Sequence, residues 1–439
     1  MNALPHGGLA LSSLEEQILQ PGVKGLPITA PLRQGAIRAQ GWNVLHGDTS
    51  FPVAVLKTSA LRHNLDWMRA FCERYKVQLA PHGKTTMSPQ LFGAQLANGA
   101  WGITLANAVQ VQVAWRFGVR RVLVANQLVA RSDVRAVLQL LHGDPDFECF
   151  VLADSLAGVA RLAEEVDAHP LARPLPVLVE LGLSGKRAGC RTLDEAMTVA
   201  RAIEHAPGLL LAGFEGYEGL LDEPEAVEAF VGKLCALVLE ADDEGLFGAP
   251  EILVTAGGSG FFDLVARGFQ GLHGLSRPLR PVLRSGCYLT SDHGMYQVQL
   301  QKLDRREGVA PGEGLRPALE IWSVVQSRPE PGLAILTMGK RDASHDAGLP
   351  VPLWTHRPGP GAPRGLPAAC EIVKMNDQHA YLRLPENDPT AGAPGWAGLE
   401  VGDLVGCGIS HPCTTFDRWP LLLAVDDDYA VRGALNTFF

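Results

Sequence analysis

The sequence lacks any apolar run of the roughly 18 residues that a membrane-spanning helix needs. Its first residues, Met1 to Gly8, show neither the basic segment nor the apolar segment of a secretory signal. No run of Lys and Arg interleaves with aromatic residues, and the formal net charge is -9, which offers no broad positive field to polyanions. These absences predict a cytoplasmic protein that binds a small molecule and has no nucleic-acid or membrane partner.

The sequence also lacks the patterns of a disulfide scaffold and of a nucleotide-binding loop. Its eight cysteines are scattered, so we expect mostly free, buried thiols, with the exception of Cys413. Neither G-x-G-x-x-G nor G-x-x-x-x-G-K-[ST] organises the chain, which argues against nucleotide-driven chemistry. The balance of 46% hydrophobic and 19% charged residues is that of an ordinary folded protein.

Short apolar runs alternate with amphipathic stretches from about residue 78 to about residue 286, which is typical of repeated βα units around a parallel sheet. Helical patterns between them include 132–141, 156–166, 192–205 and 225–242. Eight strands are the number that closes a (β/α)8 barrel. The predicted strands are Gln78 to Pro81, Gly102 to Ala106, Val122 to Ala125, Cys149 to Ala153, Pro176 to Leu181, Leu209 to Phe214, Ile252 to Ala256 and Pro281 to Ser285.

The chain length predicts more than one domain. Near residue 296 the alternation of apolar runs and amphipathic stretches gives way to short β-branched segments broken by Pro and Gly. We predict an N-terminal arm over 1–50 that packs on a β domain, an α/β TIM-type barrel over 51–295, and a second, mainly β domain over 296–439. Two loop-like stretches rich in Pro and Gly interrupt the last part, at 356–367 and 385–398. Predicted strands there are Ala318 to Gln326, Ala334 to Met338, Glu371 to Lys374, Ala380 to Arg383 and Leu404 to Ile409.

Lys84 follows the first predicted barrel strand, in the segment Pro81-His82-Gly83-Lys84-Thr85-Thr86. The carboxyl ends of barrel strands are where the active sites of such folds lie. A lysine held there can form an imine with an aldehyde cofactor once its amine loses a proton. Most lysines are solvated surface charges, so this interpretation needs support from other motifs in the sequence.

A run of small residues, Thr255 to Gly260, ends the seventh predicted strand. Consecutive glycines expose backbone N–H groups and let an anion approach closely. A phosphate group is therefore the expected ligand, with a plain Gly-rich turn as the alternative. The candidate phosphate-binding residues of this run are Thr255, Gly257, Gly258, Ser259 and Gly260.

His411 and Cys413 are separated by one residue near the C-terminus. In an extended segment, residues at i and i+2 face the same side, so imidazole and thiolate can bind one cation such as Zn²⁺ or another divalent metal. Two protein ligands leave coordination positions open, as a catalytic metal needs. A chance pairing of the two residues is the alternative.

Together these segments resemble the D-threonine aldolase and D-serine dehydratase family, which is the metal-assisted branch of the alanine-racemase-like (fold type III) pyridoxal-phosphate enzymes. The resemblance runs from about residue 50 to about residue 425 and is closest to the D-serine dehydratase-like amino acid deaminases. It implies pyridoxal 5'-phosphate as cofactor, a homodimer, and His411 and Cys413 as zinc ligands. The cofactor-binding residues that it implies are Lys84, His82, Arg187 (with Lys186 as the neighbouring candidate), Tyr217, Thr255, Gly257, Gly258, Ser259, Gly260, Gly286 and Tyr288.

The expected function is a dehydratase, or deaminase, of D-3-hydroxy amino acids such as D-serine or D-threonine, giving a 2-keto acid and ammonia. Lys84 is the expected catalytic base, because it is freed when the substrate amine displaces it from the cofactor. A D-threonine aldolase-type cleavage to glycine and an aldehyde uses the same parts and is the alternative. An amino-acid racemase has no need of the metal pair, and non-catalytic carriers of the cofactor lack the second domain.

Overall fold

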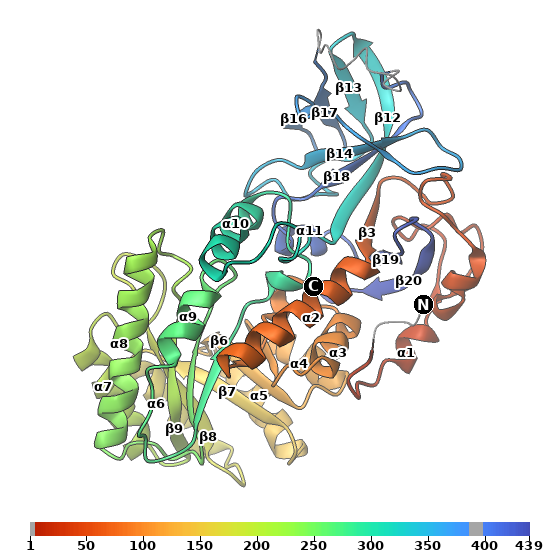
Figure 1. The fold of residues 1–439 in the computed structure, drawn as a ribbon. Coiled ribbons are helices and arrows are strands. Elements are labelled where there is room, and N and C mark those ends of the chain that lie inside the picture. Colours follow the sequence, from red (N-terminus) through yellow and green to blue (C-terminus); the bar gives the residue numbers. More distant parts are fainter. Residues whose placement is uncertain (1–4, 386–397) are drawn as a thin grey trace.

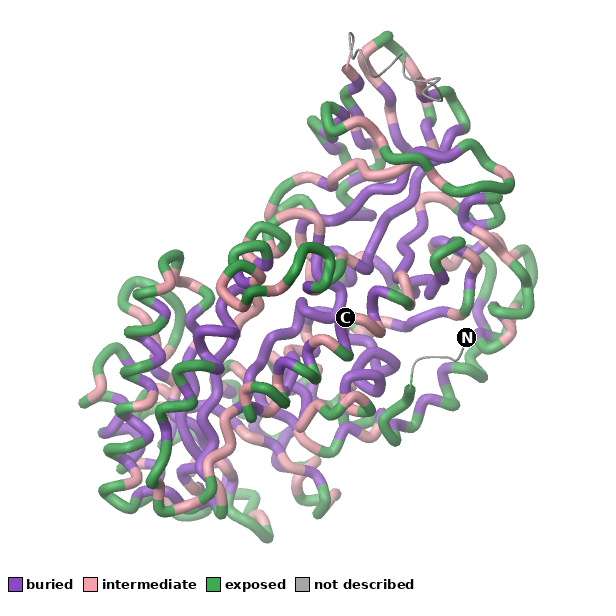
Figure 2. The backbone as a smooth tube through the Cα atoms, viewed as in Figure 1, coloured by how far each residue is buried: buried purple, intermediate pink, exposed green. Residues whose placement is uncertain are grey.

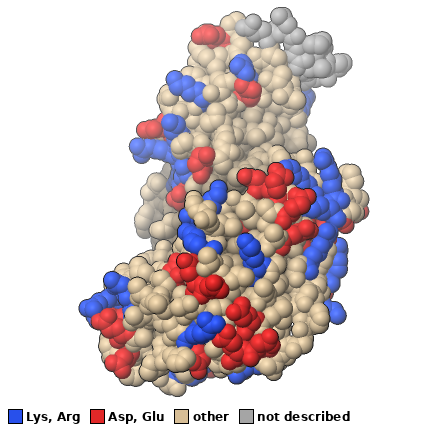
Figure 3. Space-filling view, turned by 90° about the vertical axis from the view of Figure 1, so that its left-hand side faces the viewer, with Lys and Arg blue, Asp and Glu red and all other residues tan. Residues whose placement is uncertain are grey.

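The computed structural model describes residues 5–385 and 398–439, so the predicted loop at 385–398 lies almost entirely outside the described residues. Two lobes are visible in Figure 1, a barrel with its helices and a β-rich part. In the described ranges, every helix is too short or too polar to cross a membrane. Figure 3 shows one face of the molecule, on which charged residues of both signs are interspersed.

The predicted (β/α)8 barrel followed by a mainly β domain is confirmed. Eight parallel strands pair in the order β4-β11-β10-β9-β8-β7-β6-β5. The two ends of this order also meet, because Trp101 N donates to Leu79 O at 2.7 Å and Thr104 N donates to Pro81 O at 3.0 Å. The strands are β4 (Gln78–Leu79), β5 (Ile103–Leu105), β6 (Arg121–Gln127), β7 (Glu148–Ala153), β8 (Leu175–Leu181), β9 (Leu209–Gly216), β10 (Ile252–Ala256) and β11 (Leu279–Leu283).

Amphipathic helices surround the barrel and bury their apolar faces against it. The helix over 193–205 begins where the sequence predicts, because the side chains of Thr192 and Glu195 form a reciprocal capping box. The helices are α2 (Thr58–Tyr75), α3 (Pro89–Ala97), α4 (Ala108–Arg116), α5 (Arg131–Gly143), α6 (Leu156–Ala168), α7 (Leu193–His205), α8 (Pro224–Asp243) and α9 (Phe262–Phe269). Two short 3-10 turns, η2 (Gly83–Thr85) and η3 (Cys287–Leu289), follow β4 and β11.

The second sheet has ten strands and is mainly antiparallel. Strand β3 lies within the range predicted for the barrel, yet it pairs antiparallel with β12 and parallel with β19 of this second sheet. Its residues are nearly all buried, as a strand inside a sheet requires. The strands are β3 (Val53–Lys57), β12 (Leu319–Glu330), β13 (Leu333–Leu336), β14 (Val351–His356), β15 (Arg364–Gly365), β16 (Glu371–Met375), β17 (Ala380–Arg383), β18 (Leu404–Gly408), β19 (Leu421–Val425) and β20 (Val431–Asn436).

Two helices lie between the lobes, α10 (Met295–Glu307) and α11 (Cys413–Phe416) (Figure 1). Helix α10 was not expected, because the sequence analysis predicts a mainly β domain from residue 296. It forms because Leu300 and Leu303 bury one face, two arginines occupy the last turn, and Gly308 ends it in a left-handed conformation.

The N-terminal arm carries α1 (Ser12–Glu15), β1 (Ile18–Leu19), β2 (Leu32–Arg33) and the turn η1 (Gln34–Gln40). Ile37 and Val44 are fully buried in a cluster that also contains Val55 of β3 and Leu423 of β19. The arm is therefore part of the core of the second sheet. In Figure 2 the buried backbone is concentrated along the strands of both sheets.

Candidate active site

Lys84 lies in the turn η2, directly after the first barrel strand. Burial lowers the pKa of its amine, and the nearby guanidinium groups of Arg187 and Arg284 lower it further, while Cys413 and Cys287 act in the opposite direction. A half-buried lysine with a lowered pKa holds a larger neutral fraction than a surface lysine does. The side chain is therefore suited to act as a nucleophile and as a base.

Arg187 and Tyr217 meet beside this lysine. The Arg187 guanidinium lies 5.1 Å from the centre of the Tyr217 ring. Burial and the positive charge of Arg187 lower the pKa of Lys84, and burial raises the pKa of Tyr217. Between the two neighbouring candidates of the sequence, Arg187 is the one that reaches this group, since Lys186 makes no such contact in the described chain.

The predicted phosphate loop follows β10, but two of its amides already bind a carboxylate. Glu218, which is fully buried, accepts hydrogen bonds from Gly257 N at 3.0 Å and from Gly258 N at 2.6 Å. The amides of Ser259 and Gly260 have no partner within the described residues. The loop is thus an anion-binding turn, and Ser259 and Gly260 are the members left to hold a phosphate group.

Several features of this region fit pyridoxal phosphate. His82 Nδ1 and Thr255 Oγ1 are buried polar atoms without a hydrogen-bond partner in the described chain, and both belong to the predicted cofactor set. Such orphaned atoms are rare unless a ligand or water meets them. At Gly286 a Cβ would come within 2.5 Å of His82 O, so a larger residue would close the gap between the two segments.

Tyr288 is the predicted cofactor residue that the structure does not bring to this group. Its hydroxyl lies 3.4 Å from Gln95 Nε2, and its ring lines a separate cavity of about 300 Å³ between α2 and α3. A second cavity, of about 730 Å³, opens at the other end of the barrel, around Trp101 and Phe150. Neither cavity contains Lys84.

A buried ion pair at the barrel mouth was missed by the sequence interpretation. Arg284 pairs with Glu215, and both side chains are almost fully buried. Burial raises the pKa of Glu215 to about 8, although Arg284 opposes the shift. The second carboxylate oxygen of Glu215 and Arg284 Nε lack hydrogen-bond partners in the described chain, so both can still meet a ligand. The sequence hint was Arg284 next to the Gly286 segment.

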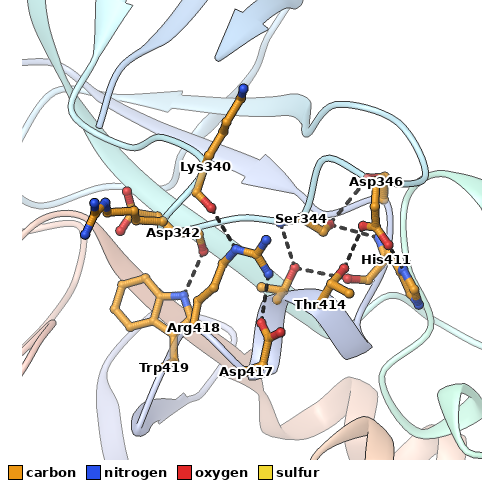
Figure 4. A network of polar contacts seen from close by, with 12 residues as sticks. Lys340, Asp342, Ser344, Asp346, His411, Thr414, Asp417, Arg418 and Trp419 are labelled. Atoms are coloured by element: carbon orange, nitrogen blue, oxygen red, sulfur yellow. Dashed lines mark hydrogen bonds and ion pairs between the residues drawn. The ribbon is translucent and has the colours of Figure 1, made fainter. Parts of the chain in front are cut away.

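His411 and Cys413 are brought together by the tight turn that begins α11, so the expected extended geometry is wrong. Pro412 has helical dihedral angles and Cys413 is the first residue of the helix. Interaction with Cys413 nevertheless raises the pKa of His411 to about 9. His411 Nδ1 lies 2.7 Å from Asp346 Oδ2, and Thr414 Oγ1 donates to Asp346 Oδ1 at 2.7 Å (Figure 4).

The donor chemistry of this pair fits a divalent metal. A carboxylate on one ring nitrogen is the arrangement that orients metal-binding histidines. Interactions with Cys287, His411 and Thr85 hold the pKa of the Cys413 thiol well below its usual value, despite burial. Across the described residues, no group of three or more His, Cys, Asp and Glu side chains is placed to hold a metal. His411 and Cys413 thus offer two donor atoms, one imidazole nitrogen and one sulfur.

The His411–Cys413 pair and the lysine segment meet at the seam between the lobes. Cys413 Sγ lies 3.4 Å from Thr85 Oγ1, the residue after Lys84, and 3.8 Å from Cys287 Sγ. Cys413 and burial raise the pKa of the Cys287 thiol, and Tyr296 of α10 lowers it. Asp346, Glu218, Cys287 and Tyr296 are site residues that sequence reasoning missed.

Comparison with known proteins identifies two domains in the chain. An alanine racemase N-terminal domain matches residues 56–264, and a putative serine dehydratase domain matches residues 318–425. The chain belongs to the alanine-racemase-like, fold-type III family of pyridoxal-phosphate enzymes. The predicted resemblance to this family is confirmed.

Characterised relatives of the chain include both an aldolase and a dehydratase. D-threonine aldolase of Arthrobacter sp. is 24% identical and the match covers 93% of this chain and 95% of the relative. D-threo-3-hydroxyaspartate dehydratase of Delftia sp. is 26% identical, over 68% of this chain and 73% of the relative. The crystal structure of D-threonine aldolase from Filomicrobium marinum superposes with a TM-score of 0.72 at 23% identity, covering 90% and 97% of the two chains.

Proposed function

We propose that this protein is a pyridoxal-phosphate- and zinc-dependent dehydratase of D-3-hydroxy amino acids such as D-serine or D-threonine, which forms a 2-keto acid and ammonia. The observation that carries the proposal is the meeting of two sets of residues from different lobes. Cys413 Sγ lies 3.4 Å from Thr85 Oγ1, so the candidate metal pair stands next to the candidate cofactor lysine.

In this proposal the barrel holds the cofactor. Lys84 binds its aldehyde, Arg187 and Tyr217 lie beside the lysine, and the amides of Ser259 and Gly260 take the phosphate. Pyridoxal phosphate supplies an aldehyde for the substrate amine and a ring that accepts the electrons released at Cα. The Lys84 amine, with its lowered pKa, removes the Cα proton of the substrate.

The second lobe holds the metal. Cys413 as a thiolate and the Nε2 atom of His411 are its two protein ligands, and Asp346 keeps the His411 ring oriented through Nδ1. A bound zinc ion supplies a Lewis acid for the β-hydroxyl of the substrate. Thr85 and Cys287 pack against Cys413 and limit where its sulfur can point.

Dehydration is preferred over retro-aldol cleavage because the His-x-Cys pair resembles that of the dehydratase-type members of the family. A putative serine dehydratase domain also spans this part of the chain. The aldolase remains the second candidate, since the long match to D-threonine aldolase favours it. The two reactions differ in which bond to Cβ breaks, so the products decide between them.

The test is product analysis with purified protein, pyridoxal phosphate and zinc. Incubation with D-serine or D-threonine is expected to give pyruvate or 2-oxobutyrate together with equimolar ammonia. Glycine with an aldehyde would establish the aldolase instead. Chelation is expected to stop turnover while the visible absorption of the bound cofactor persists, and added zinc should restore the rate. Full activity of the metal-free protein would refute the zinc mechanism and favour racemase chemistry.

We further propose that the enzyme acts in the cytoplasm as a homodimer with the small-molecule amino acid as its partner. The proposal of a dimer rests on the family resemblance. Sedimentation analysis of the loaded protein measures the state, and a monomer with full turnover would contradict it.

A further inference from the structure

We propose that Cys287 and Cys413 form a redox-active thiol pair, which a low-molecular-weight disulfide oxidises to an intramolecular disulfide. Their sulfur atoms are 3.8 Å apart although the residues are separated by 126 positions in the sequence. Cys287 begins η3 on the barrel, and Cys413 begins α11 of the second lobe. Thr85 Oγ1 contacts both sulfurs, at 3.7 Å and 3.4 Å, so the two thiols face one small polar spot.

The geometry makes closure a local movement. A disulfide has its sulfurs about 2.05 Å apart, so the two atoms need to approach by roughly 1.8 Å, within reach of side-chain rotation. Some other cysteine sulfurs of the described chain contact backbone carbonyls rather than a second sulfur. Cys190 and Cys235, for example, contact the backbone carbonyls of Asp154 and Gly268. Oxidation is therefore expected at one pair.

The difference in exposure between the two sulfurs sets the order of events. Cys413 is partly exposed, whereas Cys287 is buried. The Cys413 thiolate attacks one sulfur of the small disulfide, forms a mixed disulfide and releases one small thiolate. Cys287 then loses its proton to solvent and its sulfur attacks the Cys413 sulfur, which releases the second small thiolate. Two protein thiols are oxidised and one small disulfide is reduced to two thiols.

Closure would switch the site off. A sulfur in a disulfide is no longer a thiolate, so Cys413 could not bind the metal, and this consequence rests on the proposed function. The bond would also fasten the barrel to the second lobe at the seam where substrate must bind. Conversely, a metal bound to Cys413 should protect the pair from oxidation, because the attacking sulfur is then occupied.

The test uses the full-length protein, reduced, treated with a chelator and then incubated with oxidised glutathione. Intact mass should fall by two hydrogen atoms, and peptide mapping without reductant should find one cross-link, between the peptides of Cys287 and Cys413. Zinc uptake and zinc-supported turnover should be lost in proportion to the cross-link and return with dithiothreitol. Protein loaded with zinc first should form the cross-link more slowly.

Two variants make the result specific. Cys287→Ser cannot close the bond, so the oxidant should leave a glutathione adduct on Cys413 and no cross-link. Cys235→Ser removes a distant, partly exposed thiol and should cross-link as the unsubstituted protein does. Absence of the 287–413 cross-link while Cys413 is glutathionylated, or a cross-link between other cysteines, would overturn the proposal. A complete cross-link with unchanged zinc uptake would refute the proposal that oxidation switches the site off, and it would exclude Cys413 as a metal ligand. Failure of the dehydratase assay alone would refute the proposed function and not the cross-link.

Discussion

Replacing Asp346 with Asn should weaken zinc binding much more than it weakens the fold. Asp346 is 46% exposed and His411 is 21% exposed, so their ion pair is partly screened, and such pairs contribute about 0–1 kcal/mol to stability. The 2.7 Å contact with Nδ1 nevertheless fixes the ring and leaves Nε2 for the metal. Loss of an outer partner of a metal-bound histidine costs about 10- to 100-fold in affinity, which is about 1.4–2.7 kcal/mol.

The assay is competition for zinc with a chelator of known affinity, together with thermal unfolding of the metal-free protein. Asp417→Asn is the matched control, because Asp417 is an exposed carboxylate of the same network that pairs with Arg418 and not with His411 (Figure 4). We expect a 10- to 100-fold rise in the zinc dissociation constant for Asp346→Asn and an unchanged constant for the control. Equal zinc affinity of the two variants would refute the orienting role of Asp346.

Four further predictions concern the cofactor site and the proposed metal pair. Lys84→Ala should abolish turnover and the visible absorption band of the bound cofactor. Its thermal stability should stay near that of the control Lys302→Ala, which replaces an exposed lysine. A cofactor linkage that borohydride still reduces in Lys84→Ala would exclude this lysine. Because burial lowers the pKa of Lys84, cofactor uptake by the apoprotein should increase with pH and level off below the ordinary lysine value; a midpoint at or above that value would contradict the shift. Gly258→Val should weaken cofactor affinity, measured by equilibrium dialysis, because its Cβ would lie 3.0 Å from the Tyr217 ring, whereas Gly232→Val, with open space around it, should not. His411→Ala and Cys413→Ala should each stop dehydration yet keep the cofactor spectrum, and zinc should not rescue them; rescue by zinc would show that the pair is not the metal site.

The barrel could be predicted from the sequence because hydrophobic periodicity is local information. Each predicted barrel strand overlaps an observed one, and the helix over 193–205 carries its own capping box. Strand β14 was missed because Pro350 and Pro352 interrupt its pattern, and β3 was given to the barrel range because nothing local reveals which sheet a strand joins.

The candidate site was predictable only in part. Lys84, the Gly-rich run and His411 with Cys413 are visible as short motifs, and the structure brings these segments together. The partners that tune them come from remote segments and carry no local signal. Glu218 binds Gly257 and Gly258 from about forty residues away, and Asp346 reaches His411 across 65 positions. Tyr288 looked equivalent to its neighbours in the sequence, yet its hydroxyl points to Gln95.

The position of the metal pair relative to Lys84 depends on how the last strand is anchored. Strand β20 belongs to the second sheet, and its neighbour Phe438 donates from its backbone N to Met87 O at 2.9 Å. The buried side chain of Asn436 accepts from Gln90 Nε2 at 3.0 Å. Met87 and Gln90 follow Lys84 within six residues, so the C-terminal strand holds the segment that carries the lysine. Strand β20 pairs with β19, and β19 pairs with β3, so all three belong to the second sheet. This sheet also contains β18, which leads into His411. The same sheet therefore positions both His411 and the segment of Lys84. These hydrogen bonds hold the Lys84 segment and the His411–Cys413 pair in a fixed relation, as the proposed action of a metal and a cofactor lysine on one substrate requires.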